Sequence, residues 1–428
     1  MTLLATCAAG CEKILASEIR KLKETSALNI LDAGFGNVVF ASTSNGKNDP
    51  NGVYGIYYAL MSLRTADRIF LLLNEFYAAD FDELFEGTRA IPFEELIPDN
   101  FYISVDKVRT RLSKLSAQNA IQAIVHKAAA ERLCQAYKKE RLNENGTNAV
   151  LRVYIDKDKA RILLDICGAP LFKRGYREDG GGAPLRETTA AALLFLSRWR
   201  RKIPLCDPFC GSGTIAIEAA LYAWNAAPCM HRPFSFNNLL IADKQVEDEV
   251  RSALKARIDF SVPLKIVASD AERGMVDVAK SNLQRAIRLV CGTDAASPKY
   301  LPDFWALKME DAKALDEEGI IICNPPYGKR LGTDEDAIAN YKKMSALQKN
   351  FPSWKICVLS DHSGFESFYG SRSSNCTKII NGPIETYFYE YAQSSQAAPA
   401  PAPAYAHVKE SKEVKESKKS KKTIDWTW

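Results

Sequence analysis

Apolar and polar positions along the first 66 residues predict a small module of mixed helices and strands. Apolar runs at Thr2–Cys7 and Asn37–Ala41 have the length of strands, and Val53–Ala66 holds a possible strand and helix. Between the first two, apolar residues recur every three to four positions from about Cys11 to Lys23. Recurrence at that interval is typical of a helix with one buried face, whereas short apolar runs are typical of strands. Residues 1–66 are therefore expected to form one α/β segment.

Residues 67–167 continue with a second α/β pattern that ends in a hairpin. The expected elements are a strand at Arg68–Phe76, helical pieces at Phe81–Arg89 and Phe93–Leu96, a strand at Asn100–Val108, a helix from about Ser116 to Lys139, and strands at Asn148–Asp156 and Lys159–Cys167. The last two strands alternate apolar and polar residues around a short polar turn, which predicts a hairpin. Small α/β folds of this kind are often accessory binding modules, and we expect that role here.

Residues 184–391 alternate strands and helices more regularly. Strands are expected at Ile203–Asp207, Leu264–Asp270, Trp305–Met309, Gly319–Cys323, Trp354–Ser360, Cys376–Ile380 and Ile384–Tyr391, with helices at Leu185–Trp199, Thr214–Tyr222, Gly274–Ile287 and Asp336–Lys349. Such alternation argues for a parallel sheet with helices on both faces. The last two strands form a hairpin, which suggests one antiparallel strand inserted in that sheet. The fold class predicted is thus a Rossmann-like α/β domain that follows two smaller α/β modules.

Two segments lack these patterns. Residues 168–183 form a basic and aromatic linker that contains Lys173, Arg174, Tyr176 and Arg177. Arginine and lysine neutralise backbone phosphates, and tyrosine can stack on bases, so these four residues are candidate RNA contacts. Residues 392–428 combine an Ala-Pro repeat with a Lys/Glu/Ser run, which cannot bury enough apolar surface to fold, so a disordered basic tail is expected.

Composition excludes several classes of protein and leaves the partner open. The chain is 46% hydrophobic and 25% charged, which is typical of a globular protein. It has no apolar run of ~20 residues and no secretory signal pattern, so we expect a cytoplasmic protein without a membrane partner. Eleven cysteines without a C-x-x-C pair, and only four histidines, argue against a metal site or a disulfide framework.

The net charge of +5 does not identify a partner by itself. Residues 409–428 hold seven lysines and four acidic residues, so only +2 remains for the other 408 residues. Local features must therefore indicate what the protein binds.

A strand, a glycine-rich turn and a helix meet at Asp207-Pro-Phe-Cys-Gly-Ser-Gly-Thr. Glycine accepts positive φ at such a turn and lets a ligand approach the backbone. The candidate cofactor contacts here are Asp207, Phe209, Gly211, Gly213 and Thr214. A phosphate chain is disfavoured, because no lysine follows the glycines and Ala216 replaces the third glycine of the dinucleotide motif.

Acidic residues at the following strand ends indicate an adenosine-type cofactor. Asp270 closes the second strand, where a carboxylate usually accepts hydrogen bonds from a ribose diol. Asp311 follows the third strand and could accept from an adenine amino group. Asp207 would repel a pyrophosphate but can receive the cationic amino group of S-adenosylmethionine, although a dinucleotide remains an alternative at this point.

The reaction type is indicated by Asn324-Pro-Pro-Tyr-Gly at the end of the fourth strand. Pro325 and Pro326 make the turn rigid, so the Asn324 side-chain oxygen and a proline carbonyl can be held as paired acceptors. Paired acceptors suit the exocyclic amino group of a base, and Tyr327 offers a ring to stack on it. Orientation of that amine toward a methyl sulfonium would supply most of the rate without a nucleophilic residue.

These motifs together resemble those of the THUMP-containing class I S-adenosylmethionine-dependent RNA methyltransferases. The resemblance covers roughly residues 1–391, including Asp207-Pro-Phe-Cys-Gly-Ser-Gly-Thr, Asn324-Pro-Pro-Tyr-Gly-Lys-Arg-Leu-Gly and Leu171-Phe-Lys-Arg-Gly-Tyr-Arg. It implies a ferredoxin-like segment at 1–66, a THUMP RNA-binding domain at 67–167 and a methyltransferase domain at 184–391. That family includes bacterial large-subunit ribosomal RNA guanine-N2 methyltransferases and tRNA relatives.

The resemblance implies cofactor contacts at Asp207, Gly211, Gly213, Asp270 and Asp311, and base contacts at Asn324, Pro325 and Tyr327. This chain departs from the family pattern in an insertion at 226–262. It also carries no second glycine-rich or Asn-Pro-Pro motif, whereas longer ribosomal members have a second methylase domain.

Several functions compete. The leading hypothesis is methylation of a guanine N2 in 23S ribosomal RNA, with tRNA as another substrate. Methylation of adenine N6 in RNA or DNA would use the same acceptors. A non-catalytic RNA-binding factor is a different class, against which the intact Asp207, Asp270 and Asn324 argue. A nicotinamide oxidoreductase would leave the Asn-Pro-Pro-Tyr motif unexplained. The sequence does not indicate an oligomeric state.

Overall fold

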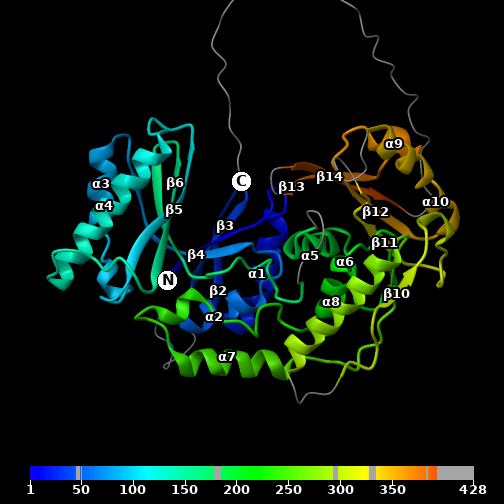
Figure 1. The fold of residues 1–428 in the computed structure, drawn as a ribbon, viewed down its shortest axis with the longest axis horizontal. Coiled ribbons are helices and arrows are strands. Elements are labelled where there is room, and N and C mark those ends of the chain that lie inside the picture. The colour runs from blue at the N-terminus through cyan, green and yellow to red at the C-terminus, as the bar shows by residue number, and fades with distance from the viewer. Residues whose placement is uncertain are drawn as a thin grey trace, which may run out of the picture.

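The computed structural model describes residues 1–44, 49, 51–177, 185–292, 297–326, 334–381 and 384–392. Two seven-stranded sheets organise these residues, one in each half of the chain (Figure 1). The predicted disorder of the tail concerns residues that, apart from residue 392, lie outside the described part of the chain. Tyr327 and the glycines at 180–182 also lie outside it.

The N-terminal sheet joins the first two predicted modules. Its strand order is β2-β3-β1-β4-β7-β6-β5, with bounds β1 Thr2–Thr6, β2 Leu28–Gly34, β3 Asn37–Ser42, β4 Arg68–Tyr77, β5 Tyr102–Arg111, β6 Asn148–Asp156 and β7 Lys159–Asp165. Strand β4 pairs with β1 through residues 68–71 and with β7 through residues 70–77, so it lies between them. The predicted boundary between residues 66 and 67 therefore falls inside one continuous sheet. Strand β2 was not predicted.

Helices cover this sheet unevenly. Helix α1 (Glu12–Ser26) packs on β2 and β3, and α2 (Val53–Ser62) contacts β3. Helices α3 (Phe81–Arg89) and α4 (Gln118–Tyr137) pack together against β4 and β5, with the short η1 turn (Phe93–Glu95) beside α4. Helix α3 begins at Asp80, whose side chain accepts a hydrogen bond from the Glu83 backbone N–H, a common helix-capping arrangement.

The C-terminal sheet has the order β10-β9-β8-β11-β12-β14-β13. Its strands are β8 Leu205–Asp207, β9 Ile266–Asp270, β10 Asp303–Ala306, β11 Ile320–Cys323, β12 Lys355–Ser360, β13 Asn375–Asn381 and β14 Ile384–Tyr391. The strands from β10 to β12 are parallel, and β14 lies antiparallel between β12 and β13. This arrangement confirms the Rossmann-like sheet with one inserted antiparallel strand.

The helices of this half mostly follow the predicted pattern. They are α5 Glu187–Leu196, α6 Thr214–Ala223, α8 Arg273–Cys291, α9 Asp334–Lys343, α10 Ala346–Asn350 and α11 Phe365–Tyr369. The predicted helix at 336–349 is two helices, because the chain turns between α9 and α10. The predicted strand at Trp305–Met309 ends at Ala306 and is followed by η3, a 3₁₀ turn at Met309–Asp311.

The insertion at 226–262 connects the two halves of the chain through helix packing and hydrogen bonds. It contains η2 (Ser235–Asn238) and α7 (Lys244–Ala256), and α7 packs on α2 of the N-terminal half (Figure 1). The Leu240 backbone N–H donates to the Leu96 carbonyl over 2.9 Å, and the Cys229 N–H donates to the Met61 carbonyl over 3.0 Å. Chain segments far apart in sequence therefore share backbone hydrogen bonds across the junction.

The buried Arg64 side chain makes a second set of hydrogen bonds between the two halves. Its Nη2 donates to the carbonyl of Ala226 over 2.5 Å and to that of Leu221 over 3.3 Å. Glu18 accepts from the Arg64 backbone N–H over 2.7 Å, so the loop that carries Arg64 is also held within its own module. Apolar residues of both halves form one continuous core.

The cysteines behave as small apolar residues. All eleven are free, and nine of them are buried, where a free cysteine packs as a small apolar side chain. Among the described residues no cluster of three or more metal-ligating side chains is placed to hold an ion. In that part of the chain no helix is both long and apolar enough to cross a membrane.

Candidate active site

A cavity of about 880 Å³ lies at the carboxyl ends of the C-terminal sheet. Its walls come from the turn after β8, the ends of β9 and β11, η3 and α9. The strand order reverses between β8 and β11, which is where doubly wound sheets bind ligands. Its volume is within the range of small-molecule sites.

The two glycines of the glycine-rich turn have different surroundings. Both have positive φ, 51° at Gly211 and 84° at Gly213. A Cβ on Gly211 would meet open space, and Gly211 lines the cavity. A Cβ on Gly213 would come within 2.9 Å of the Ala279 Cβ on α8. Gly213 does not line the cavity, and the structure shows a packing role for it, while its cofactor contact stays a prediction.

Asp207 lies at the bottom of the cavity and is buried. Burial raises the pKa of its carboxyl to about 8, the Phe209 backbone N–H opposes this rise, and the like charge of Asp270 adds to it. The only hydrogen bond that Asp207 accepts among the described residues comes from that N–H, over 3.2 Å. A buried carboxylate with so few donors is suited to a cationic ligand.

Asp270 and Phe209 also line this cavity, as predicted from the strand ends. The Asp270 carboxylate accepts from the backbone N–H of Gly211 over 3.0 Å and from that of Glu272 over 2.9 Å. These two bonds orient the carboxylate beside the glycine turn. Its partial exposure leaves oxygen lone pairs available to a ligand.

Asp311 does not line the cavity, and its cofactor contact stays a prediction. Its side chain is exposed, whereas Met309 and Glu310 of the same turn face the cavity. The difference arises because β10 ends at Ala306, three residues earlier than expected, and the 3₁₀ turn then changes the direction of each side chain.

Asn324 stands where β11 ends, and its side chain has an unused acceptor. The Oδ1 atom is buried and has no hydrogen-bond partner among the described residues. Asn324 and Pro326 line the same cavity as Asp207, whereas Pro325 is buried behind them. Buried polar atoms nearly always have a partner, so this oxygen is placed for a donor on a ligand.

Helix α9 forms a wall of the cavity that the sequence did not assign. Asp336, Asn340 and Lys343 line it, together with Ala339. The Lys343 Nζ lies 3.9 Å from the Glu310 carboxylate, an ion pair that links α9 to η3. The sequence could have indicated this wall, because these residues are spaced by three and four positions and so lie on one face of a helix.

The predicted RNA contacts in the linker require correction. Arg174 and Tyr176 are buried, each about 1% exposed. Arg174 Nε lies 3.5 Å from the Glu218 carboxylate of α6, and the Tyr176 hydroxyl donates to that carboxylate over 3.2 Å. These side chains are held by partners more than 40 positions away, so they are not available to RNA.

The other two linker residues are placed differently. Arg177 Nη2 donates to the Thr214 Oγ1 over 2.7 Å and to the Leu185 carbonyl over 3.1 Å. Thr214 and Leu185 line the cavity, so Arg177 positions part of its wall. Lys173 alone is exposed and stays a candidate RNA contact.

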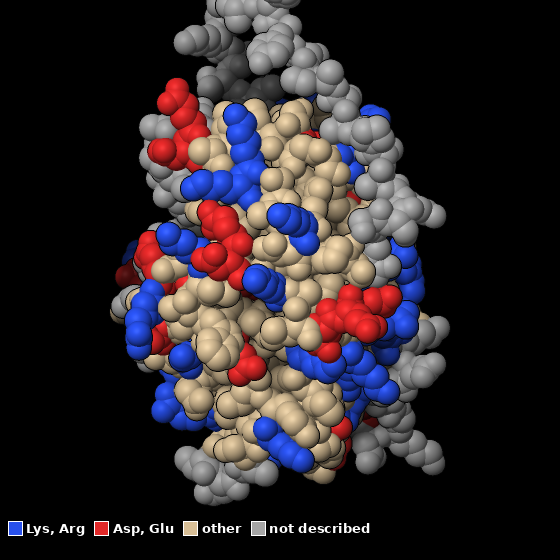
Figure 2. Space-filling view, turned by 90° about the vertical axis from the view of Figure 1, so that its right-hand side faces the viewer, with Lys and Arg blue, Asp and Glu red and all other residues tan. Residues whose placement is uncertain are grey.

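Surface charge at the end of the molecule that the C-terminal sheet forms does not indicate a substrate face. Figure 2 shows the end of the molecule formed by the C-terminal sheet, where basic and acidic side chains are interspersed among broad uncharged areas. A nucleic-acid surface usually carries a concentration of basic residues, which this view does not show.

Comparison with known proteins connects both halves to named families. Residues 174–390 match the family model described as "RMKL-like, methyltransferase domain", and residues 78–165 match the THUMP domain. YpsC of Bacillus subtilis (strain 168), provisionally named an RNA methyltransferase, is 36% identical over 392 residues, covering 91% of this chain and 95% of its own. The ribosomal RNA large subunit methyltransferase K/L of Psychromonas ingrahamii is 32% identical over 83% of this chain, and the match spans 47% of that longer protein.

Among solved structures, SMU.472 is similar over most of its length. It is provisionally described as a methyltransferase and was crystallised with S-adenosylhomocysteine (SAH). It is 31% identical, with a TM-score of 0.78, over 91% of this chain and 97% of its own.

Proposed function

Because this chain belongs to the RMKL-like methyltransferase family and carries a THUMP domain before its methyltransferase domain, we propose that it methylates the exocyclic N2 of a guanine in 23S ribosomal RNA. It is an S-adenosylmethionine-dependent RNA methyltransferase. The observation that carries the proposal is that Asn324, whose Oδ1 has no hydrogen-bond partner in the described part of the chain, lines the same cavity as the buried Asp207. One group is placed to accept from an amine and the other to receive a cation.

The residues present fit S-adenosylmethionine. Asp207, with its raised pKa, is placed to receive the amino group of the cofactor, and Asp270 to accept from its ribose hydroxyls. Gly211 leaves its backbone open to the cofactor chain. When bound, the cofactor supplies an electrophilic methyl group on a sulfonium. Met309 and Glu310 of η3 line the cavity beside these residues.

Asn324 orients the acceptor base. Its Oδ1 accepts a hydrogen bond from the exocyclic amino group, which directs the nitrogen lone pair toward the methyl group. The two prolines after it fix this oxygen, so little reorganisation is needed at the moment of reaction. The new nitrogen–carbon bond would form as the bond between the methyl carbon and the sulfonium sulfur breaks, and the extra proton of the amine would pass to solvent. No side chain has to act as a nucleophile.

Nucleoside mass spectrometry tests the base and the RNA. Ribosomal RNA and tRNA from cells with and without this gene should differ by one N2-methylguanosine in 23S ribosomal RNA. Loss of N6-methyladenosine would select the alternative base, and loss of N2-methylguanosine from tRNA the alternative substrate. Unchanged nucleosides would favour the non-catalytic RNA-binding factor.

Replacement of Asp270 by alanine should weaken cofactor binding by about 1–3 kcal/mol, the scale of lost hydrogen bonds to a charged group. Isothermal titration with SAH measures this directly. Asp270→Asn is the matched variant, since it keeps an acceptor for the Gly211 N–H and removes only the charge. Unchanged affinity in Asp270→Ala would remove Asp270 from the site.

Cofactor binding at pH 7 should release about one proton from Asp207. The pKa of about 8 means that the carboxyl is mostly protonated at pH 7, and a cationic ligand favours its ionised form. Affinity should therefore rise with pH toward 8 before the ligand's own amino group, with a pKa of ~8, loses its charge. Titrations with SAH in buffers of different ionisation enthalpy count the released protons. Asp207→Asn should eliminate this release, and equal release in both proteins would contradict the pairing.

A further inference from the structure

Helix α9 is attached to the part of the C-terminal sheet that carries Asn324. Its residues Ala337 and Tyr341 are buried in the same apolar cluster as Cys323, which directly precedes Asn324 in β11. The Ser360 Oγ, at the end of β12, donates to the Tyr341 hydroxyl over 3.2 Å. The helix therefore packs at the carboxyl ends of β11 and β12.

The reversal of strand order divides the cavity into two sides. Asp207, Gly211 and Asp270, the residues that we propose hold the cofactor, come from β8, the turn after it and β9. Asn324 and α9 come from the opposite side, where β11 and β12 lie. A side chain with which α9 lines the cavity is therefore expected beside the acceptor base.

Asp336 contributes a carboxylate to this wall of the cavity. The residue is exposed, so it lies at the mouth, where a base enters. Lys343, seven residues further along α9, pairs with Glu310 of η3 over 3.9 Å. Seven helical residues span about 10 Å. Asp336 is thus at the end of α9 that lies away from η3.

The edge of guanine next to the N2 amino group suits a carboxylate. The guanine N1 carries a hydrogen and donates, whereas the adenine N1, next to the N6 amino group, has no hydrogen and accepts. A carboxylate only accepts hydrogen bonds, so it binds the first edge and repels the second. Asn324 alone does not separate the two bases, because both offer it an amino group.

We propose that Asp336 selects guanine by accepting a hydrogen bond from the guanine N1–H, while the Asn324 Oδ1 accepts from the N2 amino group. A base that is taken out of its stack exposes both of these donors on one edge. A carboxylate has about four acceptor positions, so Asp336 can bind a base together with contacts within the protein. This inference rests on the proposed methylation of guanine N2 and names the residue that excludes adenine.

Methylation of 2-aminopurine tests the contact, because this base keeps the N2 amino group but has no hydrogen on N1. Two synthetic RNA fragments carry guanine or 2-aminopurine at the position mapped by nucleoside mass spectrometry, and the full chain methylates each in a single turnover. Asp336→Asn should lower the ratio of the guanine rate to the 2-aminopurine rate by at least about tenfold, since its amide can donate to the bare N1. The intrinsic difference between the two amines is the same for both proteins and cancels.

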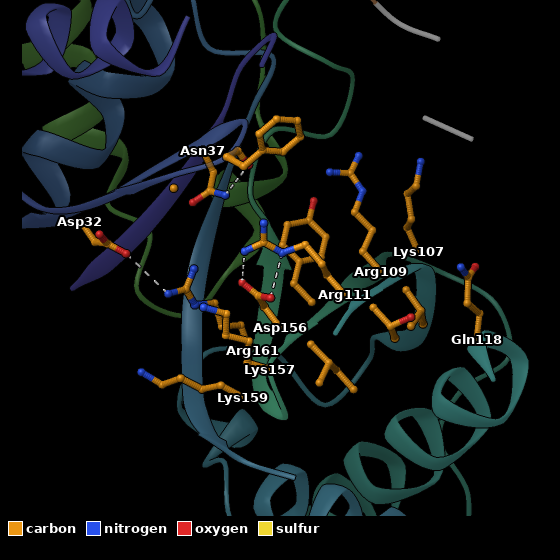
Figure 3. A pocket seen from close by; sticks show the side chains of 16 residues that line it. Asp32, Asn37, Lys107, Arg109, Arg111, Gln118, Asp156, Lys157, Lys159 and Arg161 are labelled. Carbon is orange, nitrogen blue, oxygen red and sulfur yellow. Dashed lines mark hydrogen bonds and ion pairs between the residues drawn. The ribbon is translucent and has the colours of Figure 1, made fainter. Parts of the chain in front are cut away.

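Two control variants should keep the wild-type ratio. Glu335→Gln changes the neighbouring exposed carboxylate, which does not line the cavity. Arg109→Ala changes a second cavity of about 630 Å³ in the N-terminal sheet, which Lys107, Arg109 and Arg111 line (Figure 3). Any change in RNA affinity in that variant affects both fragments alike. An equal fall of the ratio in all three variants would overturn the proposal.

Titration with SAH separates a base contact from a cofactor contact. Asp336→Asn should bind SAH within a few-fold of the wild type, which also shows that the variant is folded. A loss of SAH affinity as large as that of Asp270→Ala would assign Asp336 to the cofactor and overturn its contact with the base.

The wild-type reaction separates this inference from the proposed function. Wild-type protein that methylates guanine, together with an unchanged ratio in Asp336→Asn, would overturn the role of Asp336 alone. Wild-type protein that methylates adenine N6 in place of guanine N2 would overturn the proposed function and this inference with it.

Discussion

Replacement of Asn324 by alanine should reduce methyl transfer by about 10²–10³-fold or more, while the affinity for the cofactor stays within a few-fold of the wild type. The loss has the size expected when a preorganised hydrogen-bonding group at the reacting centre is removed. Cofactor affinity should persist because Asp207, Asp270 and Gly211, the residues that we propose hold the cofactor, are unchanged. Single-turnover methylation of RNA and titration with SAH measure the two quantities separately.

The fold of the Asn324→Ala variant should be unaffected, because the Oδ1 atom makes no hydrogen bond with a described residue. Asn145→Ala removes the same amide from an exposed loop and should leave the activity unchanged. An Asn324→Ala variant that lost cofactor affinity and activity in equal measure would contradict the assignment of Asn324 to the base.

Replacement of Arg174 by alanine should lower the free energy of unfolding by about 3–5 kcal/mol, the cost of removing one partner of a buried ion pair. Arg174 Nη2 donates to the Arg64 carbonyl over 2.5 Å, and its Nη1 donates to the Leu171 carbonyl over 2.8 Å. The substitution removes a guanidinium donor from both carbonyls and the counter-charge from the buried Glu218 carboxylate, which keeps its hydrogen bond from Tyr176. Urea-induced unfolding of the full chain measures the change.

Lys173→Ala is the matched control for Arg174, since it removes the neighbouring exposed cation and should change the stability by less than ~0.5 kcal/mol. The double variant Arg174→Met/Glu218→Gln should recover part of the loss, because it removes both charges. Normal stability of Arg174→Ala together with reduced RNA affinity would restore the rejected role as an RNA contact.

The sequence predicted the Rossmann-like sheet and the place of its site because both depend on local signals. Asp207, Asp270 and Asn324 stand at ends of apolar strands, and the carboxyl ends of parallel strands meet at one edge. The structure places all three at one cavity. Their assignment to cofactor and base stays a prediction, as do the domain boundaries.

The remaining errors concern long-range packing. A basic and aromatic segment has the same composition whether it is exposed or buried. Arg174 is buried, and its ion-pair partner is Glu218, 44 positions away. Gly213 resembles a ligand-binding glycine, and only the approach of Ala279 shows its packing role. The alternating residues Lys107, Arg109 and Arg111 were readable on a strand, but the sequence did not say which face the helices would cover.

The contacts that Arg64, Arg174 and α7 make between the two halves have a consequence for how the target nucleotide is chosen. If the THUMP domain and Asn324 both hold the same RNA, a rigid connection fixes the distance between these two contacts. The protein would then select its target nucleotide mainly by the number of nucleotides between that target and the RNA stretch held by the N-terminal half. The sequence around the target would matter less. A flexible linker between the halves would allow many spacings between the two RNA contacts, whereas this junction allows only a narrow range of spacings.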